Sequence, residues 1–445
     1  MDYISNAPYD EKIMLERIGL SRMEDLAQPI PEKLRLKDLR IPPGLSEAAL
    51  KRFFREKAGE NWNVLEHPSY LGAGSYDHFI PSVVDHIVRR SEFYTSYTPY
   101  QGEASQGMLQ AIFEYQTMMA ELTGMDVANA SLYDGASSAA EAALMALSLQ
   151  EGRRKVLVSK AVHPAYRRVL QTYLRALSVE ILEVPYDPLE GRTDMEALEG
   201  MASEEAACCL VQNPNFFGSV EEMAEIGKKL RAKGILFVSI VYPLSLGLLS
   251  PPGEYGADIA CGEAQSFGNP LNFGGPYLGF FATRTAHLRK IPGRIVGQTC
   301  DALGERGFVL TLQTREQHIR REKATSNICT NEGLCALSAA VFLAALGESG
   351  IQELADQNLQ RSHYLANRVS KLKGFRLHFR APFFNEFVVE SSRGLSLIER
   401  RFAQKGILGP LPLKTFYPEL ENCLLFCVTE TKTKEMMDQL VRVMS

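Results

Sequence analysis

The sequence predicts an α/β protein in which a large domain built on a mainly parallel sheet is followed by a small α+β domain. Between Ser69 and Arg294, apolar runs typical of buried strands alternate with stretches of helical periodicity. After Gln313 the order changes to helices followed by strand-like runs. Strands that alternate with helices pair in parallel, because each helix returns the chain to the same end of the sheet.

The elements follow in order along the chain. Residues 1–65 form a helical extension, with a helix over Tyr9 to Ile18 that ends at Gly19. The large domain, 66–312, contains the predicted strands Lys155 to Ser159, Glu180 to Val184, Ala207 to Gln212, Ile235 to Val241 and Tyr277 to Ala282. The small domain, 313–445, contains helices over Leu334 to Leu346 and Ile351 to Leu372 and strands near Phe387 to Val389 and Cys423 to Val428.

Composition narrows the class of protein. A chain of 445 residues, 45% hydrophobic and 23% charged, is long enough for two packed domains and predicts a soluble globular protein. A net charge of -5, spread over both signs, argues against nucleic acid and anionic membranes as partners. The eight cysteines form no paired C-x-x-C sets, so we expect reduced thiols and neither a metal site nor a disulfide framework. With no visible targeting signal at Met1 to Lys12, the expected compartment is the cytoplasm.

Two polar blocks stand out as candidates for function. Gln313 to Thr330 places dense charge beside the hydroxyls and amides of Ala-Thr-Ser-Asn, which suits an anion or a partner surface. A charged surface helix with internal ion pairs is the alternative. Tyr97 to Gly107 is a polar aromatic loop that runs into an amphipathic stretch from Met108 to Leu122.

Together these blocks resemble one family, glycine dehydrogenase (decarboxylating), the P-protein of the glycine cleavage system. The resemblance is to subunit 1 of the form that is split into two different subunits. It covers nearly the whole chain, including Pro8 to Leu36, Asn129 to Leu144 and Gly256 to Thr283. It implies the aspartate aminotransferase-like fold (fold type I) of pyridoxal phosphate (PLP) enzymes.

The resemblance also implies where the cofactor chemistry would lie. PLP catalysis needs a lysine for the imine, a carboxylate for the pyridine nitrogen and donors for the phosphate. Alignment with the catalytic half of the family places Gln265 at the lysine and Tyr242 at the carboxylate. A neutral amide cannot form an imine, so we expect this chain to have no PLP of its own.

Other parts of that centre are present in outline. Asp134 to Ser138 opens a helix and resembles the phosphate cup, with Gly135 and Ser137 as its residues. His163 falls where the family stacks an imidazole on the pyridine ring, although a structural histidine is the alternative. These residues, with Tyr242 and Gln265, are interpreted as a vestigial site.

A subunit of this kind would act through a shared interface. Thr98, Tyr100 and Gln101 are the candidates for a wall of the partner's active site, with simple packing of the loop as the alternative. Thr325, Ser326 and Asn327 are expected to reach across the interface toward the cofactor phosphate. The charged residues of the block, Arg315, His318, Arg320 and Arg321, would either bind a carboxylate or join the subunits.

The function implied is that of subunit 1 of a heteromeric glycine decarboxylase, inactive alone. With a PLP-bearing subunit 2, in a predicted heterotetramer of two copies each, it would release CO2 from glycine and pass the aminomethyl group to the lipoyl arm of H-protein. Two alternatives remain: an autonomous PLP enzyme with an unrecognised lysine, and a scaffold that does not shape its partner's site.

Overall fold

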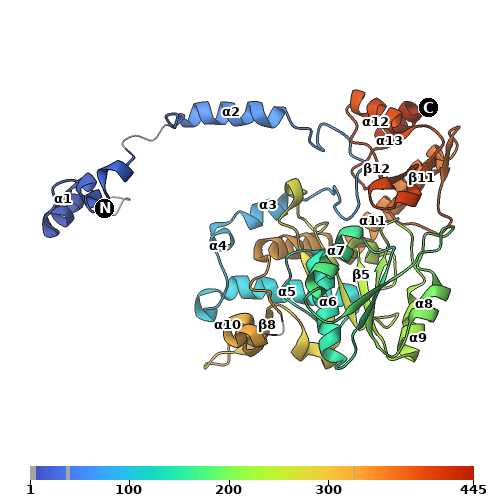
Figure 1. Ribbon diagram of the computed structural model, residues 1–445, viewed down its shortest axis with the longest axis horizontal. Coiled ribbons are helices and arrows are strands. Elements are labelled where there is room, and N and C mark those ends of the chain that lie inside the picture. The colour runs from blue at the N-terminus through green and yellow to red at the C-terminus, as the bar shows by residue number, and fades with distance from the viewer. Residues whose placement is uncertain (1–6, 37–40, 325) are drawn as a thin grey trace. The chain divides into compact units, whose positions relative to one another are not determined.

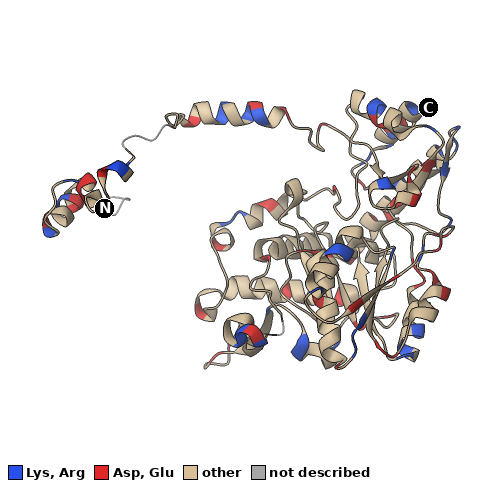
Figure 2. Cartoon of the chain, viewed as in Figure 1, with Lys and Arg blue, Asp and Glu red and all other residues tan. Residues whose placement is uncertain are grey.

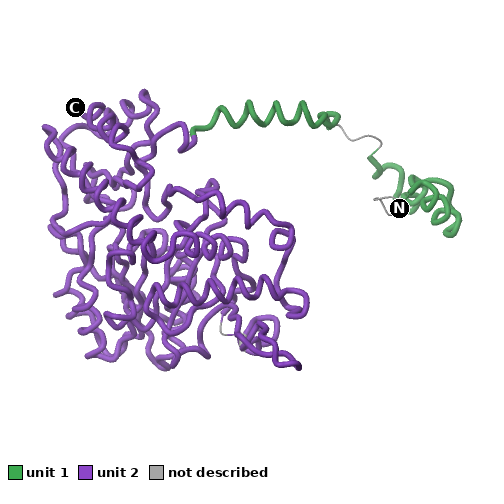
Figure 3. The backbone as a smooth tube through the Cα atoms, turned by 180° about the vertical axis from the view of Figure 1, so that it is seen from behind, with its two compact units in different colours: residues 1–62 green, residues 63–445 purple. Residues whose placement is uncertain are grey.

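The computed structural model describes residues 7–36, 41–324 and 326–445. Contacts divide the chain into two compact units, Met1–Trp62 and Asn63–Ser445 (Figure 3). The first contains the helices α1 (Pro8–Arg17) and α2 (Glu47–Gly59). The second contains both major sheets (Figure 1). The predicted domain boundary at residues 312 and 313 lies inside this second unit and stays a prediction.

The central sheet has seven strands in the order β1-β7-β6-β5-β4-β2-β3. Its strands, in chain order, are β1 (Val127–Ala128), β2 (Lys155–Ser159), β3 (Glu180–Val184), β4 (Ala206–Asn213), β5 (Leu236–Val241), β6 (Ile259–Glu263) and β7 (Gly279–Thr283). Strands β3, β2, β4, β5 and β6 pair in parallel, and β7 pairs antiparallel with β6 and with β1. The sheet is therefore mainly parallel, as the alternation of strands and helices predicts.

Both faces of this sheet are buried. Along β5, Phe237 packs into the core on one face, and Val238 packs into the core on the other. Helices α6 (Gly135–Leu149) and α7 (Pro164–Leu174) cover the face of Val238, whereas α5 (Gln106–Thr123) and α9 (Met223–Ala232) cover the face of Phe237. Burial on both faces explains why these strands read as continuous apolar runs.

The C-terminal part carries an antiparallel sheet in the order β10-β11-β13-β12. Its elements are β10 (Phe375–Leu377), β11 (Glu386–Ser391), α12 (Leu395–Gln404), β12 (Leu411–Pro412), β13 (Cys423–Cys427) and α13 (Lys434–Met444). Apolar residues of α12, α13 and the end of α11 (Gly333–Val369) pack on it. This arrangement matches the predicted small α+β part.

Helix α11 consists of two helical stretches that the sequence predicts. The helices predicted over Leu334 to Leu346 and Ile351 to Leu372 are joined across a kink at Gly347, whose φ of 63° lies in the left-handed region. By length and composition α11 also passes as a membrane span. Its residues Leu337 and Phe342 are instead buried in the protein core, so we interpret α11 as a core helix.

A hairpin of β8 (Ile295–Cys300) and β9 (Arg306–Thr311) was not predicted from the sequence. It packs against α5 through Phe308 and Leu310, with Met108 and Ile112 on the helix. Acidic and basic residues are mixed along the chain rather than gathered by sign (Figure 2). The hairpin leads directly into the charged block that begins at Gln313.

Candidate functional site

The residues predicted for the cofactor site come together at the carboxyl edge of the sheet. His163 follows β2, Tyr242 follows β5 and Gln265 follows β6, while Gly135 and Ser137 begin α6. This edge is where open α/β sheets bind ligands. The structure thus brings these residues together from separate parts of the chain, and the contacts each one makes decide what the site can do.

Gln265 is buried and saturated with hydrogen bonds. Its Oε1 accepts from the Tyr76 backbone N–H at 3.0 Å, and its Nε2 donates to the Tyr76 carbonyl at 3.0 Å and to the Asn269 carbonyl at 2.7 Å. The side chain is only 2% exposed. An amide offers both an acceptor and donors, whereas a lysine ammonium offers donors alone. Gln265 therefore fastens the loop that carries Tyr76 to the end of β6.

The start of α6 is closed by carboxylates of the chain itself. The Gly135 N–H donates to Glu263 Oε2 at 2.9 Å, and the Ser137 N–H donates to Asp134 Oδ1 at 2.7 Å. Burial raises the pKa of Glu263 to about 7, and the Asp134 carboxylate adds to that rise, against the opposing effect of backbone N–H donors. The amides predicted to attract an anion are thus already paired.

Aromatic rings fill the space beside these amides. The Tyr166 ring stacks on His163 with 5.0 Å between centroids. A Cβ on Gly135 would lie 2.1 Å from the Tyr166 hydroxyl oxygen, so the helix can begin this close to the ring only with glycine. Burial raises the pKa of Tyr166 well above its ordinary value, with the Glu263 carboxylate contributing.

His163 has a fixed tautomer. Its Nδ1 accepts from the Ala165 N–H at 3.0 Å, so the proton lies on Nε2, which donates to the Ala73 carbonyl at 2.8 Å. Burial lowers the pKa of His163 to about 4. The ring is a neutral structural group that joins α7 to the loop around Ala73.

Tyr242 belongs to a buried chain of hydrogen bonds. Its hydroxyl hydrogen-bonds with His78 Nε2, and His78 Nδ1 lies 2.8 Å from Glu430 Oε2. Burial opposes ionisation of Glu430, but the His78 ring and the donors Phe79 and Asn358 outweigh it and lower the pKa to about 2. The Tyr242 ring also packs on Tyr76 at 4.4 Å, and Tyr76 donates to Glu386 at 2.7 Å. The Tyr242 side chain is therefore held by contacts within the protein.

The second group of predicted residues lies on the surface. Tyr100 is 50% exposed, Gln101 is exposed and Thr98 is half-buried. Ser326 accepts from the Ile328 N–H at 3.0 Å, and Asn327 is exposed, while Thr325 lies outside the described residues. The charged block forms short turns around α10 (Gln317–Arg320) rather than the charged helix that was the alternative.

Arg294 connects the two polar blocks, and sequence reasoning missed it. Its guanidinium, on a residue 3% exposed, donates to the Tyr100 hydroxyl at 3.0 Å and to the Cys329 carbonyl at 2.5 Å. Tyr76, His78, Tyr166 and Glu263 were also missed. The small residues of Gly72-Ala-Gly-Ser-Tyr76 were the available signal for a closely packed loop, whereas a lone arginine gives no sequence signal.

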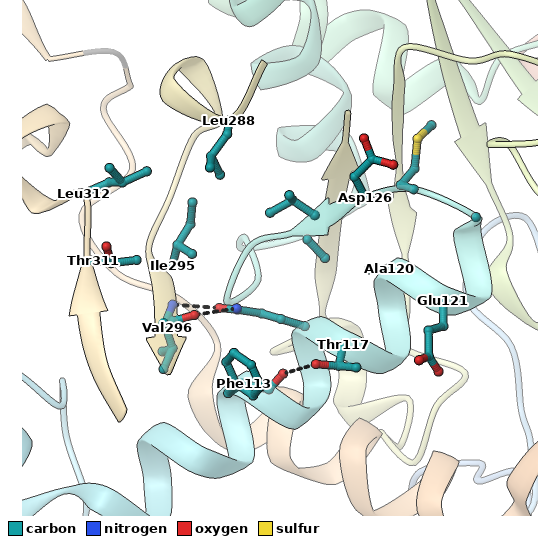
Figure 4. Close-up of a pocket in the computed structure, with 16 residues that line it drawn as sticks. Phe113, Thr117, Ala120, Glu121, Asp126, Leu288, Ile295, Val296, Thr311 and Leu312 are labelled. Carbon is teal, nitrogen blue, oxygen red and sulfur yellow. Dashed lines mark hydrogen bonds between the residues drawn. The ribbon is translucent and has the colours of Figure 1, made fainter. Parts of the chain in front are cut away.

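A separate groove of about 600 Å³ lies between α5, the turn before β1 and the β8–β9 hairpin (Figure 4). Its lining is mostly apolar, with Phe113, Ile295 and Leu312 among its residues. It includes none of the residues predicted for the site. Across the described part of the chain, no group of His, Cys, Asp or Glu is arranged to hold a metal ion.

Comparison with solved structures identifies the fold. A sphingosine-1-phosphate lyase of Burkholderia pseudomallei is 14% identical, with a TM-score of 0.66 and 93% of each chain covered. A NifS-like protein is 13% identical, with a TM-score of 0.61 over 84% of this chain and 97% of the other. At such identities the likeness shows the fold alone, which is that of the PLP-dependent transferases.

Closer relatives identify the family. The glycine cleavage system P-protein model matches residues 1–444, so the chain belongs to that family. A crystal structure of glycine decarboxylase (P-protein), in inhibitor-bound form, is 43% identical, with a TM-score of 0.91 and 100% and 99% of the chains covered. Probable glycine dehydrogenase (decarboxylating) subunit 1 is 55% identical in Desulfitobacterium hafniense, covering 99% of this chain and 98% of the relative, and 53% identical in Moorella thermoacetica, covering 100% and 99%.

Proposed function

We propose that this chain is the subunit without a cofactor of its own in a heteromeric glycine decarboxylase. The family and the resemblance to subunit 1 support the activity. The absence of a cofactor on this chain is supported by the carboxyl edge of the central sheet, where the predicted site residues are already hydrogen-bonded or covered within the chain. Gln265 has no amine, carboxylates pair the amides at the start of α6, and Tyr166 covers His163. These residues do not fit PLP, because carboxyl oxygens already accept from the N–H groups that would bind its phosphate, and its ring would meet Tyr166.

The cofactor is then carried by the lysine-bearing subunit 2. When bound there, PLP supplies the electron sink for loss of CO2 from glycine. The complex passes the remaining aminomethyl group to the lipoyl arm of H-protein. No step of this reaction is assigned to the carboxyl edge of the present chain.

The contribution of this chain lies in its exposed polar surface. Tyr100, Gln101 and Asn327 present a phenol and amides to solvent, and Thr98 and Ser326 add hydroxyls beside them. Such groups suit a wall that excludes water and donates hydrogen bonds to a partner's site. His318 and the arginines of the block would join the subunits there.

Assembly with another chain is supported by the first unit. Taken by itself, this unit leaves apolar side chains uncovered, and they need a surface to pack on: Ile13, Met14, Ile18, Phe53 and Phe54. We propose a heterotetramer of two copies of each subunit in the cytoplasm. All eight cysteines are free thiols, which suits a reducing compartment.

The test is intact mass after incubation with PLP and borohydride, on this chain alone and mixed with its lysine-bearing partner. We expect a phosphopyridoxyl adduct only on the partner, and release of CO2 from glycine only in the mixture. Stoichiometric labelling of a lysine in this chain alone would overturn the proposal and make it an autonomous PLP enzyme.

Size-exclusion chromatography of the co-expressed pair tests the assembly separately. We expect one peak at the mass of two copies of each subunit. Elution as separate subunits would contradict the heterotetramer while leaving the labelling result intact.

A further inference from the structure

Arg294 lies just before β8 and between the two exposed polar blocks. Its Nη1 donates to Thr330 Oγ1 at 3.0 Å and to Asn331 Oδ1 at 3.3 Å. Its Nη2 donates to the Tyr100 hydroxyl at 3.0 Å and to the Cys329 carbonyl at 2.5 Å. The terminal N–H groups of this guanidinium are therefore engaged with both blocks at once, and the residue is 3% exposed.

The charge of Arg294 is balanced inside the protein. Its Nε lies 3.8 Å from Glu316 Oε2, and Glu316 is itself only 9% exposed. His318 Nδ1 lies 3.6 Å from the same carboxylate oxygen. Because the guanidinium is buried, paired and fully engaged at its tips, Arg294 is unsuited to binding a substrate carboxylate directly. What it can do is hold other groups in place.

Arg294 restricts the position of the Tyr100 side chain. The guanidinium carbon lies 5.3 Å from the centroid of the Tyr100 ring, and the His318 ring packs edge-on at 5.6 Å. The hydroxyl oxygen accepts from Arg294, so the phenol keeps its own proton to donate. Half of the residue remains exposed. The ring is thus held by buried groups, and its hydroxyl proton is not used in the bond to Arg294.

We propose that Arg294 is a positioning residue for glycine decarboxylation, and that it acts by orienting the Tyr100 phenol toward the partner's active site. This inference rests on the proposed function, which places Tyr100 at that interface. A planar guanidinium fork can grip both blocks together, whereas a lysine ammonium cannot reproduce the geometry. Arg294 therefore couples the loop at Tyr97 to the segment that ends at Thr330.

The experiment uses the assembled complex and measures kcat and KM for release of CO2 from glycine. Loss of one oriented hydrogen bond in the transition state should lower kcat about tenfold in Y100F, with less change in KM. R294K should lower kcat by a similar factor. If Arg294 acts through Tyr100, the double variant Y100F/R294K should fall no more than about twofold below the lower single variant.

A matched control is R306K on β9, where Arg306 also lies over an aromatic ring, 5.7 Å from the centroid of Phe308. Wild-type kcat is expected there. Should R294K fail to fold, R294Q/E316Q removes both buried charges together. This variant then replaces R294K in the comparison with Y100F.

The outcomes separate the two proposals. Single-variant losses that multiply to about a hundredfold in the double variant, or wild-type kcat in R294K, would overturn the positioning role alone. Full turnover in the Y100F complex would instead overturn the placement of Tyr100 at the active site, and with it the proposed function of this surface.

Discussion

The carboxyl edge of the sheet and the surface around Arg294 use the same kinds of side chain to different ends. At the edge, Gln265 is 2% exposed and its amide is saturated by the Tyr76 and Asn269 backbones. At the surface, Tyr100 is 50% exposed and is held only from its inner side. A polar group whose bonds are all made inside the chain stabilises the fold, whereas an anchored and exposed group is available to a partner.

Substituting Gln265 by lysine, at the carboxyl edge of the sheet, should have the largest effect on stability. A lysine cannot accept from the Tyr76 N–H, and its ammonium would lose its hydration on burial. We expect a loss of about 3 to 5 kcal/mol in the free energy of unfolding, measured by urea denaturation, and no adduct after PLP and borohydride. The control is Q404K on the exposed face of α12. A stable Q265K variant that forms the adduct would show that the edge is open to cofactor.

Gly135→Ala should have the next largest effect on the free energy of unfolding. Its Cβ would lie 2.1 Å from the Tyr166 hydroxyl oxygen and 2.9 Å from the Glu263 Cβ, which forces the ring or the helix to move. We expect a loss of about 3 kcal/mol. Gly200→Ala in α8 (Met195–Met201) is the control, since a Cβ there meets nothing within 4 Å. Equal unfolding midpoints for the two variants would refute the close packing at α6.

The pH dependence of stability should reveal Glu263. Its folded pKa of about 7 lies above the unfolded value, so its protonated form favours the folded state at low pH. That contribution is lost as the pH rises from about 4.5 to 7. E263Q should therefore gain about 3 kcal/mol relative to wild type over this range. If the curves of unfolding free energy against pH for E263Q and wild type are parallel, Glu263 does not titrate in this pH range.

The smallest effect on stability is expected at the surface. Asn327→Ala should change the free energy of unfolding by less than about 0.5 kcal/mol, because the residue is exposed. In the assembled complex the same change should lower turnover severalfold, if Asn327 reaches the partner's site. The exposed Asn422→Ala provides the control. Unchanged turnover in N327A would favour a scaffold that does not shape the site.

The amino-acid sequence alone predicts the α/β class, the strands β2 and β3 and the residues that follow β2, β5 and β6. These depend on local apolar periodicity and on the rule that parallel strands end at one edge. It also determined that Gln265 cannot form an imine, since that is a property of the side chain alone. The hairpin at β8 and β9 escaped prediction because its stability depends on packing against α5.

The difference between the two regions follows from contacts in the folded chain. That Glu263 pairs the Gly135 amide, that Tyr166 covers His163 and that Arg294 joins Tyr100 to Cys329 are contacts between residues far apart in the chain. Hydrogen bonding and burial depend on distance in space, and one sequence without its fold gives no such distances. The chemistry a residue type permits is written in the sequence, but whether that group is free to act depends on its neighbours in the folded chain.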